Sequence, residues 1–500
     1  MAGADIPWGT AKARWILLTT ILGSSMAMLD STVVNVALPT LGEDLDAALS
    51  GLQWTVNAYT LTLASLILVG GSLGDRMGRR RIFLFGIAWF AVASLLCGLS
   101  QNIWQLIAAR ALQGVGGALL TPGSLALIQS SFVPADRARA IGTWAGLGGV
   151  ATLIGPFLGG WLIDQANWRW IFLINVPLAV VALVVGRRHV PESRDQRAAG
   201  HFDWWGAIFA ILTLGAGTYA LIYAADDLTR VDVVVAGLVA VGGAVGFVLS
   251  QRREANPMLP LGIFDSRQFS AANAMTFLVY GALSAVFFIL VLQLQVVAGF
   301  SATAAGLAML PVTVLMMLLS ARAGVLAGKI GPRSLMSIGP LICAAGVLLM
   351  LRVGPGADYV TDVLPGAVVF GLGLSALVAP LTATVLSAVE DRYAGIASGV
   401  NNAVARAAGL LAVAGLPLIV GLSTDVGLTP QDLDSAYDKA MIGNAVMLAA
   451  GGVLAWLTIR TPQPSRTEVE QPSDAGVSPH GLPCMPCCLV LQPGRLRASR

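Results

Sequence analysis

The stretch Gly71–Arg80 reads GSLGDRMGRR, and it recurs as GVLAGKIGPR at Gly324–Arg333, 253 residues further along the chain. Both copies follow the pattern G-x-L-small-x-basic-x-G-x-R, and each comes directly after a long apolar run. The glycines permit a sharp turn at the end of a helix, and basic residues are typical of loops on one side of a membrane. The repeat therefore predicts a chain made of two related halves.

The composition is that of a membrane protein. Of the 500 residues, 56% are hydrophobic and only 11% are charged, whereas soluble domains carry about 25% charged residues. A helix needs about 20 apolar residues to cross the hydrocarbon core, and we count fourteen such runs. The predicted fold class is therefore an all-α polytopic membrane protein. The spans lie at 15–38, 52–73, 82–100, 104–128, 139–163, 170–186, 204–223, 231–250, 270–297, 304–328, 334–352, 363–388, 399–423 and 440–459.

The position of the repeat divides these spans into groups. The first copy closes the second span and the second copy closes the tenth, so two helices are inserted between two six-helix halves. Repeated halves of this kind are the usual architecture of secondary transporters. The predicted organisation is a cytoplasmic N-terminus (1–14), an N-terminal six-helix bundle (15–190), two linker helices (203–250), a C-terminal six-helix bundle (268–460) and a disordered cytoplasmic tail (461–500).

The loops that carry Lys and Arg predict the orientation. If the N-terminus is cytoplasmic, the inside segments hold 23 of the 30 basic residues and the outside loops hold 4. Because cytoplasmic loops are enriched in Lys and Arg, both termini are predicted to be cytoplasmic. We expect a multi-pass protein of the cell membrane, with the lipid bilayer as its surroundings.

An acidic residue lies inside the first apolar run, in LDSTVVNVALP (29–39). Burying Asp30 there costs roughly 2.5–3.5 kcal/mol even on the lenient insertion scale, and no other Asp or Glu is predicted inside a span. At about 1.5 Å per residue, Asp30 and Arg110 lie at nearly the same depth. Burial disfavours a charged carboxyl and a nearby cation favours it, so the pair predicts a proton-coupling site. The alternative is a static ion pair that only holds helices together.

Six motifs resemble those of the major facilitator superfamily, and specifically its fourteen-helix drug:proton antiporters, which include actinobacterial antibiotic and multidrug exporters. The resemblance covers about 15–460 and implies the major facilitator fold. The motifs are LDSTVVNVALP (29–39), GSLGDRMGRRR (71–81), LIAARALQGVGGA (106–118), GLGGVATLIGPFLGG (146–160), WRWIFLINVP (168–177) and ASGVNNAVARAAG (397–409).

The resemblance implies roles for two of these motifs. The loop after the second span would be a cytoplasmic gate that stabilises one state of the transport cycle; the alternative is a plain positive-inside signal. The glycine-rich fifth span would mark an exporter; the alternative is a close helix interface without directional meaning. The gate residues are Gly71, Gly74, Asp75, Arg76, Gly78, Arg79 and Arg80, and those of the fifth span are Gly155, Pro156, Gly159 and Gly160.

Polar residues inside other spans are candidates for a substrate cavity. Each of them taken alone is more often part of a hydrogen bond between helices. The candidates are Asn35, Asn57, Gln113, Gln293, Asn401 and Arg406.

The predicted function is proton-coupled antiport that exports hydrophobic drugs or antibiotics by alternating access. We expect a small hydrophobic or cationic substrate and protons as partners, no nucleic acid and a monomer. No enzyme motif is found, and the tail motif CMPCC (484–488) has no second Cys pair, so no cofactor or metal site is predicted. The alternatives are a uniporter or importer of a small metabolite on the same fold, and a non-transporting membrane receptor or scaffold.

Overall fold

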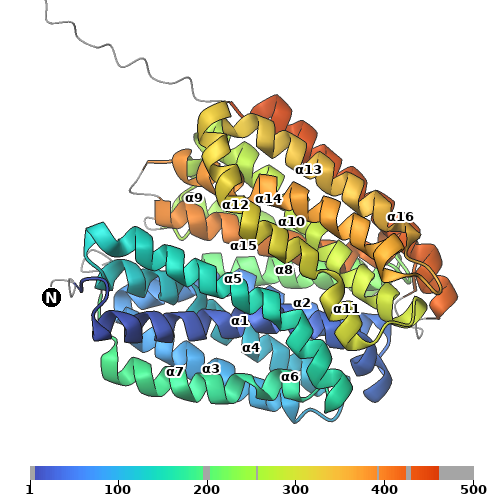
Figure 1. The fold of residues 1–500 in the computed structure, drawn as a ribbon, viewed down its shortest axis with the longest axis horizontal. Helices are drawn as coiled ribbons and strands as arrows, with labels where there is room; N and C mark the ends of the chain where they lie inside the picture. Colours follow the sequence, from blue (N-terminus) through green and yellow to red (C-terminus); the bar gives the residue numbers. More distant parts are fainter. Residues whose placement is uncertain (1–5, 195–202, 255–256, 391–393, 424–428, 461–500) are drawn as a thin grey trace, which may run out of the picture. The chain divides into compact units, whose positions relative to one another are not determined.

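The computed structural model describes residues 6–194, 203–254, 257–390, 394–423 and 429–460. Within these ranges fourteen helical spans are long and apolar enough to cross a membrane, which confirms the predicted number. The described ranges contain no β-strand beyond one isolated bridge between Ile6 and Phe132. The fold class is therefore the predicted all-α polytopic membrane protein (Figure 1). The predicted disordered tail lies outside the described residues.

Seven helices build the first six spans, two build the inserted pair, and the remaining elements build the last six spans. The first group is α1 (Ala11–Asp44), α2 (Leu49–Met77), α3 (Arg79–Gly98), α4 (Ile103–Ser131), α5 (Pro134–Gln165), α6 (Trp170–Leu173) and α7 (Asn175–His189). The inserted pair is α8 (Trp204–Tyr223) and α9 (Val231–Arg253). The last group is η1 (Leu261–Asp265), α10 (Arg267–Leu292), η2 (Gln293–Val297), α11 (Ala302–Ala308), α12 (Leu310–Ile330), α13 (Pro332–Leu349), η3 (Met350–Arg352), η4 (Tyr359–Val363), α14 (Leu364–Ser387), α15 (Ala394–Val420) and α16 (Pro430–Thr458).

Several helices are longer than their apolar runs. The first begins at Ala11 rather than at residue 15 and continues to Asp44, and the last begins at Pro430, ten residues before the predicted start. Counting apolar residues finds only the part of a helix that lies in hydrocarbon. Polar turns beyond that part still form helical hydrogen bonds, and Thr429 caps the start of α16 by accepting from the Asp432 amide.

Four spans divide into two α-helices or contain a π-helical segment, which hydropathy did not predict. The sixth span divides into α6 and α7, the ninth ends in the π-helical η2, the tenth divides into α11 and α12, and the twelfth starts with the π-helical η4. Three of these breaks have a proline in the first turn of the following helix, namely Pro177, Pro311 and Pro365. Proline lacks an N–H and disfavours a helical residue before it, so it begins a new helix there.

The repeat is visible in the backbone. Gly78 joins α2 to α3 with φ +115°, and Gly331 joins α12 to α13 with φ +86°. These two glycines occupy the same position of the two sequence copies. Only glycine adopts such angles without strain, which explains its presence in both turns.

Matching glycines also pack matching helices. A Cβ on Gly86 of α3 would lie 3.0 Å from the Leu120 nitrogen of α4, and one on Gly339 of α13 would lie 3.0 Å from the Gly373 oxygen of α14. Small residues allow helix backbones to approach closely where no larger side chain fits. The α3–α4 and α13–α14 pairs are therefore built alike in the two parts of the chain.

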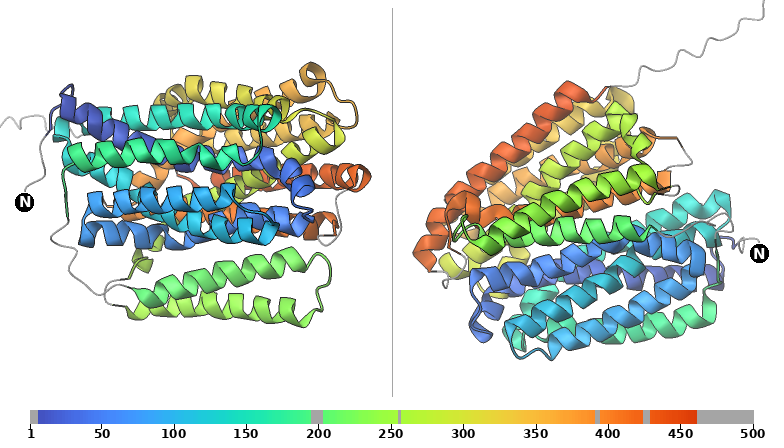
Figure 2. Two further views of the ribbon diagram at one scale, coloured as in Figure 1. Left: turned by 90° about the horizontal axis from the view of Figure 1, so that it is seen from below. Right: turned by 180° about the vertical axis from the view of Figure 1, so that it is seen from behind.

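The inserted helices α8 and α9 pack mainly on each other and form a separate pair at one side of the bundle (Figure 2). Gly246 of α9 accommodates the Phe209 ring of α8, where a Cβ would lie 2.6 Å from the ring. Helix α8 also contacts α2 and α15. Only 11% of the 18-residue apolar stretch of α9 is buried in the protein, so most of α9 is left to face lipid.

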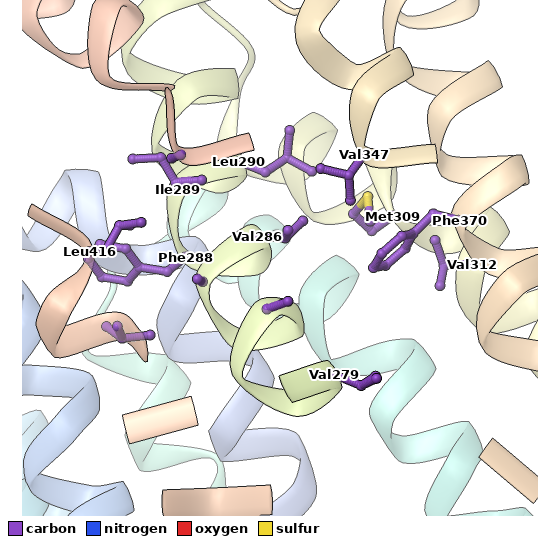
Figure 3. Packing of buried hydrophobic residues seen from close by; sticks show 14 of the residues in the cluster. Val279, Val286, Phe288, Ile289, Leu290, Met309, Val312, Val347, Phe370 and Leu416 are labelled. Carbon is purple, nitrogen blue, oxygen red and sulfur yellow. The ribbon is translucent and has the colours of Figure 1, made fainter. Parts of the chain in front are cut away.

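Helix α10 lies at the centre of the larger apolar core. The 18-residue apolar stretch of its span is 67% buried inside the protein, which is the highest share among the fourteen spans. Val286, Ile289 and Leu290 point from successive turns of α10 toward neighbouring helices, and Phe370 of α14 approaches from the other side (Figure 3). A helix that is apolar all round is expected at the interior of such a bundle.

The α1–α7 and α10–α16 groups meet at the end of the bundle opposite the N-terminus. A Cβ on Gly160 of α5 would lie 2.4 Å from the Ala302 oxygen of α11, and one on Gly306 would lie 2.2 Å from the Pro156 oxygen. Asp164 of α5 also accepts hydrogen bonds from the Thr303 amide and hydroxyl at 2.9 and 2.6 Å. Backbone therefore lies directly against backbone at this end.

Near the other end of the bundle, several glycines have free space beside them. Gly142, Gly146 and Gly149 lie on the part of α5 nearest the N-terminus, and a Cβ on any of them would meet nothing within 4 Å. The same holds for Gly328 near the end of α12. The backbone contact between α5 and α11 therefore has no counterpart at these glycines.

Candidate functional site

Asp30 and Arg110 form a buried ion pair. Helix α1 carries the carboxylate and α4 carries the guanidinium, with Arg110 Nη1 2.5 Å from Asp30 Oδ2. The Asp30 side chain is 0% exposed and that of Arg110 is 1% exposed. Removing one member of a buried pair typically costs about 3–5 kcal/mol, because the other charge is left without a partner. The two predicted proton-coupling residues are thus brought into direct contact.

Gln113 is the hydrogen-bonding partner of both charges. Its Nε2 donates to Asp30 Oδ1 at 2.7 Å and to Ser94 Oγ at 2.8 Å, while its Oε1 accepts from Arg110 Nη1 at 2.6 Å. Arg110 Nε donates to the Thr55 carbonyl at 3.1 Å. One helical turn separates Arg110 from Gln113, so the same face of α4 presents both side chains.

An aromatic ring covers the cation. The Tyr59 ring of α2 lies 4.3 Å from the Arg110 guanidinium carbon, and Phe172 of α6 lies 5.8 Å from it. Cation–π contact in a desolvated site is worth about 2 kcal/mol. The Tyr59 hydroxyl donates to the Ala27 carbonyl at 3.5 Å, so α2, α1 and α4 meet around one charged centre.

The loop between α2 and α3 is bound to the segment that follows α7. Asp75 pairs with Arg79 one turn later at 2.7 Å. The Arg79 amide donates to the Ser193 carbonyl at 2.9 Å, and the Arg80 amide donates to Glu192 Oε1 at 3.0 Å. A Cβ on Gly78 would lie 2.7 Å from that Glu192 carboxylate. Glu192 therefore accepts from an otherwise unsatisfied amide at the N-terminus of α3.

The other gate residues have ordinary helical positions. A Cβ on Gly71 would lie 3.7 Å from Pro122 of α4, and one on Gly74 would lie 4.0 Å from the Arg79 Cα. Arg80 also donates from Nη1 to the Val190 carbonyl at 3.0 Å. Arg76 lies in the last turn of α2, where a cation complements the helix dipole.

The glycines of the fifth span contact two different helices. A Cβ on Gly155 would lie 2.4 Å from Thr32 Oγ1, and one on Gly159 would lie 2.5 Å from Val33, both on α1 within a turn of Asp30. Gly160 and Pro156 instead face α11, as described above. Helix α5 therefore packs directly against the helix of the buried carboxylate and against the other half of the chain.

The cavity candidates are dispersed. Gln113 lies in the ion-pair network. Gln293, the first residue of η2, donates to the Val353 carbonyl at 2.9 Å and to Asp434 at 2.6 Å. Asn35 is half-buried on α1, five residues from Asp30 and on another face of the helix. Asn57 Nδ2, Asn57 Oδ1 and Arg406 Nε are buried and have no hydrogen-bond partner.

Asn401 borders a pocket in the last group of helices. Its Nδ2 donates to Thr276 at 2.7 Å and to Asn273 at 3.2 Å. The partly open pocket has an empty volume of about 440 Å³. It is lined by Tyr280 of α10, by Thr382, Val385 and Leu386 of α14, and by Ser398, Asn401, Asn402 and Ala405 of α15.

Reasoning from sequence missed three side chains at these places. Ser94 is an ordinary serine in an apolar run, and Glu192 follows a proline in a loop, so neither shows a pattern. Asp164 near the end of α5 was not recognised either, because its partner Thr303 is 139 residues further along the chain. Among the described residues, no group of three or more His, Cys, Asp or Glu side chains is placed to hold a metal ion.

Comparison with known proteins gives consistent matches. The family model described as Major Facilitator Superfamily matches residues 20–413. The tetracenomycin C resistance and export protein of Streptomyces glaucescens is 33% identical over 83% of this chain and 76% of its own. The methylenomycin A resistance protein of Bacillus subtilis is 35% identical, covering 88% and 93%. The multidrug efflux pump LfrA of Mycolicibacterium smegmatis is 33% identical, covering 88% of each chain.

Solved structures share the fold at low identity. A bacterial homologue of the human lysosomal transporter Spinster, in an inward-facing and unoccupied conformation, gives a TM-score of 0.63 with 16% identity over 90% of this chain and 97% of its own. The POT family transporter PepTSo gives a TM-score of 0.66 with 13% identity, covering 89% and 97%.

Proposed function

The chain belongs to the major facilitator superfamily, and from that premise we propose that it is a proton-coupled antiporter that exports small hydrophobic drugs or antibiotics. The chain is a multi-pass membrane protein whose relatives are drug and antibiotic efflux proteins. The single observation that carries the proton coupling is the fully buried Asp30–Arg110 pair. A carboxylate at this depth is expensive to keep, and a proton can neutralise it.

The proposed coupling step is a competition for Asp30. When a proton binds the carboxylate, the attraction between Asp30 and Arg110 is lost, and Gln113 and Thr55 remain as partners of the guanidinium. Helices α1 and α4 are then free to shift relative to each other. Because Gly155 and Gly159 hold α5 tightly against α1, such a shift is passed to α5 and to its contact with α11.

We propose that the end of the bundle near the N-terminus is open. We also propose that this end is cytoplasmic, as the Lys and Arg distribution predicts. The conformation is then inward-facing, with the outer end closed by α5 and α11. The proposed α1–α7 and α10–α16 bundles rock about the cavity between them, α8 and α9 serve as linker helices, and both termini lie in the cytoplasm. The α2–α3 loop with Glu192 stabilises one state at the inner side.

Proteoliposomes with an imposed pH gradient test the mechanism. We expect wild-type protein to move a hydrophobic substrate such as ethidium against its concentration gradient when protons can flow the other way. Asp30→Asn keeps the size of the side chain and removes the titratable group, so exchange driven by the gradient is expected to disappear while binding persists.

Each alternative predicts another result. A uniporter or importer would carry substrate down its own gradient, with equal rates at equal pH on both sides. A receptor or scaffold would bind substrate and transport nothing. Transport that ignores the pH gradient, or that Asp30→Asn leaves intact, would refute proton antiport.

A further inference from the structure

Arg406 of α15 lies between two contacts that α15 makes with α2. Gln53 Nε2 donates to the Val413 carbonyl at 2.5 Å, and a Cβ on Gly399 would lie 3.0 Å from Leu68. Arg406 is seven residues from Val413 and seven from Gly399, which is about two helical turns in each direction. All three residues therefore share the face of α15 that is directed at α2.

The same count places Arg406 near the charged centre. Seven residues along α2 from Gln53 lies Thr60, so Arg406 is opposite Thr60 and its neighbours. Tyr59, which covers Arg110, shares an electrostatic interaction with both Arg110 and Arg406. Tyr59 therefore contacts the proton-coupling pair and lies on the stretch of α2 opposite the second cation.

The described residues supply no counter-charge for Arg406. No ion pair includes it, and its half-buried side chain has an enclosed Nε with no hydrogen-bond acceptor. Asp30, the acidic residue nearest in depth, is bound to Arg110. Tyr59 offers a phenol and no carboxylate. A guanidinium held among helices without an anion is costly, so an anion from outside the chain is the missing partner.

A buried amide on α2, three residues before Thr60, also lacks partners. Asn57 is one turn from Gln53 on α2, is 1% exposed, and has no hydrogen bond to either Nδ2 or Oδ1. Gln53 Oε1 on the same face is unpaired as well. Buried polar groups without partners are uncommon. The Arg406 Nε–H and the Asn57 Nδ2–H are donors, and together they suit an oxyanion.

We propose that Arg406 and Asn57 bind an oxyanion of the transported compound, such as a carboxylate, next to the proton-coupling pair. This inference rests on the proposed export function and narrows its substrate class from hydrophobic or cationic compounds to hydrophobic acids. The pocket by Asn402, one turn from Arg406, is lined by an aromatic ring, amides and hydroxyls without a charged residue, so it suits the uncharged body of such a compound.

Three matched pyrene probes test the proposal. They are 1-pyrenebutyrate, 1-pyrenebutanol and 1-pyrenebutylamine, which share a ring and chain and differ in charge. Binding to purified full-length protein is measured by pyrene fluorescence for wild type, Arg406→Gln, Arg406→Lys and Arg322→Gln. Arg322 is an exposed arginine of α12, so its substitution controls for loss of one positive charge.

We expect wild type to bind the carboxylate probe most tightly. Arg406→Gln should lower that affinity about tenfold or more, as for a lost charge-assisted hydrogen bond, and leave the alcohol probe unchanged. Arg406→Lys should restore part of the affinity, and Arg322→Gln should match wild type. The proposal is overturned if wild type binds no probe, binds the three alike, prefers the amine, or loses all probes equally in Arg406→Gln.

Two further arms separate related explanations. If a free inorganic anion fills the site, lowering the chloride concentration will change alcohol-probe binding and carboxylate-probe binding alike, which overturns the substrate assignment. Asp30→Asn is assayed beside Arg406→Gln in proteoliposomes. If only the proton-antiport proposal is wrong, Asp30→Asn will transport like wild type while Arg406→Gln still loses its preference for the carboxylate probe. The two proposals can therefore fail separately.

Discussion

At Asp30 an unfavourable burial is offset by a dense set of partners. The carboxylate receives Arg110 on one oxygen and Gln113 on the other, and no part of it is exposed. Sequence reasoning placed Asp30 and Arg110 at one depth, because helical rise converts residue number into depth. It assigned Gln113 to a substrate cavity, whereas the structure places that side chain between the two charges.

Replacing Gln113 by Leu tests this arrangement. The change leaves Asp30 Oδ1 and Ser94 Oγ without their donor, so we expect a loss of about 1–3 kcal/mol in stability. Gln431→Leu, at an exposed position of α16, is the control and should lie within about 0.5 kcal/mol of wild type. Thermal unfolding of the detergent-solubilised proteins measures both, and equal melting temperatures for the two variants would contradict a structural role for Gln113.

Gly78→Ala tests the turn of the gate. At φ +115° and with a Cβ only 2.7 Å from Glu192, alanine would be strained, at a cost of about 1–3 kcal/mol. Gly74→Ala, with 4.0 Å of room on the same helix, is the matched control and should be neutral or slightly stabilising. Thermal unfolding decides between them, and a Gly78→Ala protein as stable as the control would show that the turn tolerates a side chain.

At the scale of elements, helix α5 links the charged centre to the contact between the two halves. Its glycines face α1 at Gly155 and Gly159 and α11 at Gly160. A Cβ on Gly142 or Gly146 of the same helix would meet nothing within 4 Å. Sequence reasoning recognised the glycine cluster but not the helices that it contacts. Spacing along one helix shows which face is small, and only packing shows which neighbour occupies it.

Gly306→Ala should weaken the closed end. The added Cβ would lie 2.2 Å from the Pro156 oxygen, and backbone cannot yield as a side chain does, so α11 must move away from α5. We expect a longer spin-label distance between Gln165→Cys and Val360→Cys, two exposed positions at that end. Gly328→Ala, with nothing within 4 Å, is the control. An unchanged distance in Gly306→Ala would mean that the contact does not hold the end closed.

At the scale of the whole molecule, the fourteen spans and their alternation set the proposed orientation. The Lys and Arg bias is large enough to determine a topology, although it reads only loops. The structure adds that one end of the bundle is closed between α5 and α11. In the proposed orientation this closed end is the outer one, as expected for the inward-facing state that the proposed export cycle begins from.

Thiol labelling of intact cells tests the orientation. In a protein with Cys484, Cys487 and Cys488 changed to Ser, the remaining Cys97 and Cys343 are buried. An added Asp227→Cys between α8 and α9 should react with a membrane-impermeant maleimide, because that loop is predicted to be outside. Arg188→Cys at the end of α7 should react only after the cells are opened, and the reverse pattern would invert the proposed topology.

The sequence by itself determined the fold class, the number of spans, the repeat and the identity of the buried carboxylate. These features can be read from the length of each apolar run and from the residues within it, which are properties of single helices. Only the tertiary structure decided that Gln113 joins the ion pair and that Glu192 binds the α2–α3 loop. It also leaves Asn57 and Arg406 Nε buried without hydrogen-bond partners among the described residues. Those relations join residues far apart in the chain, and their geometry depends on how helices pack.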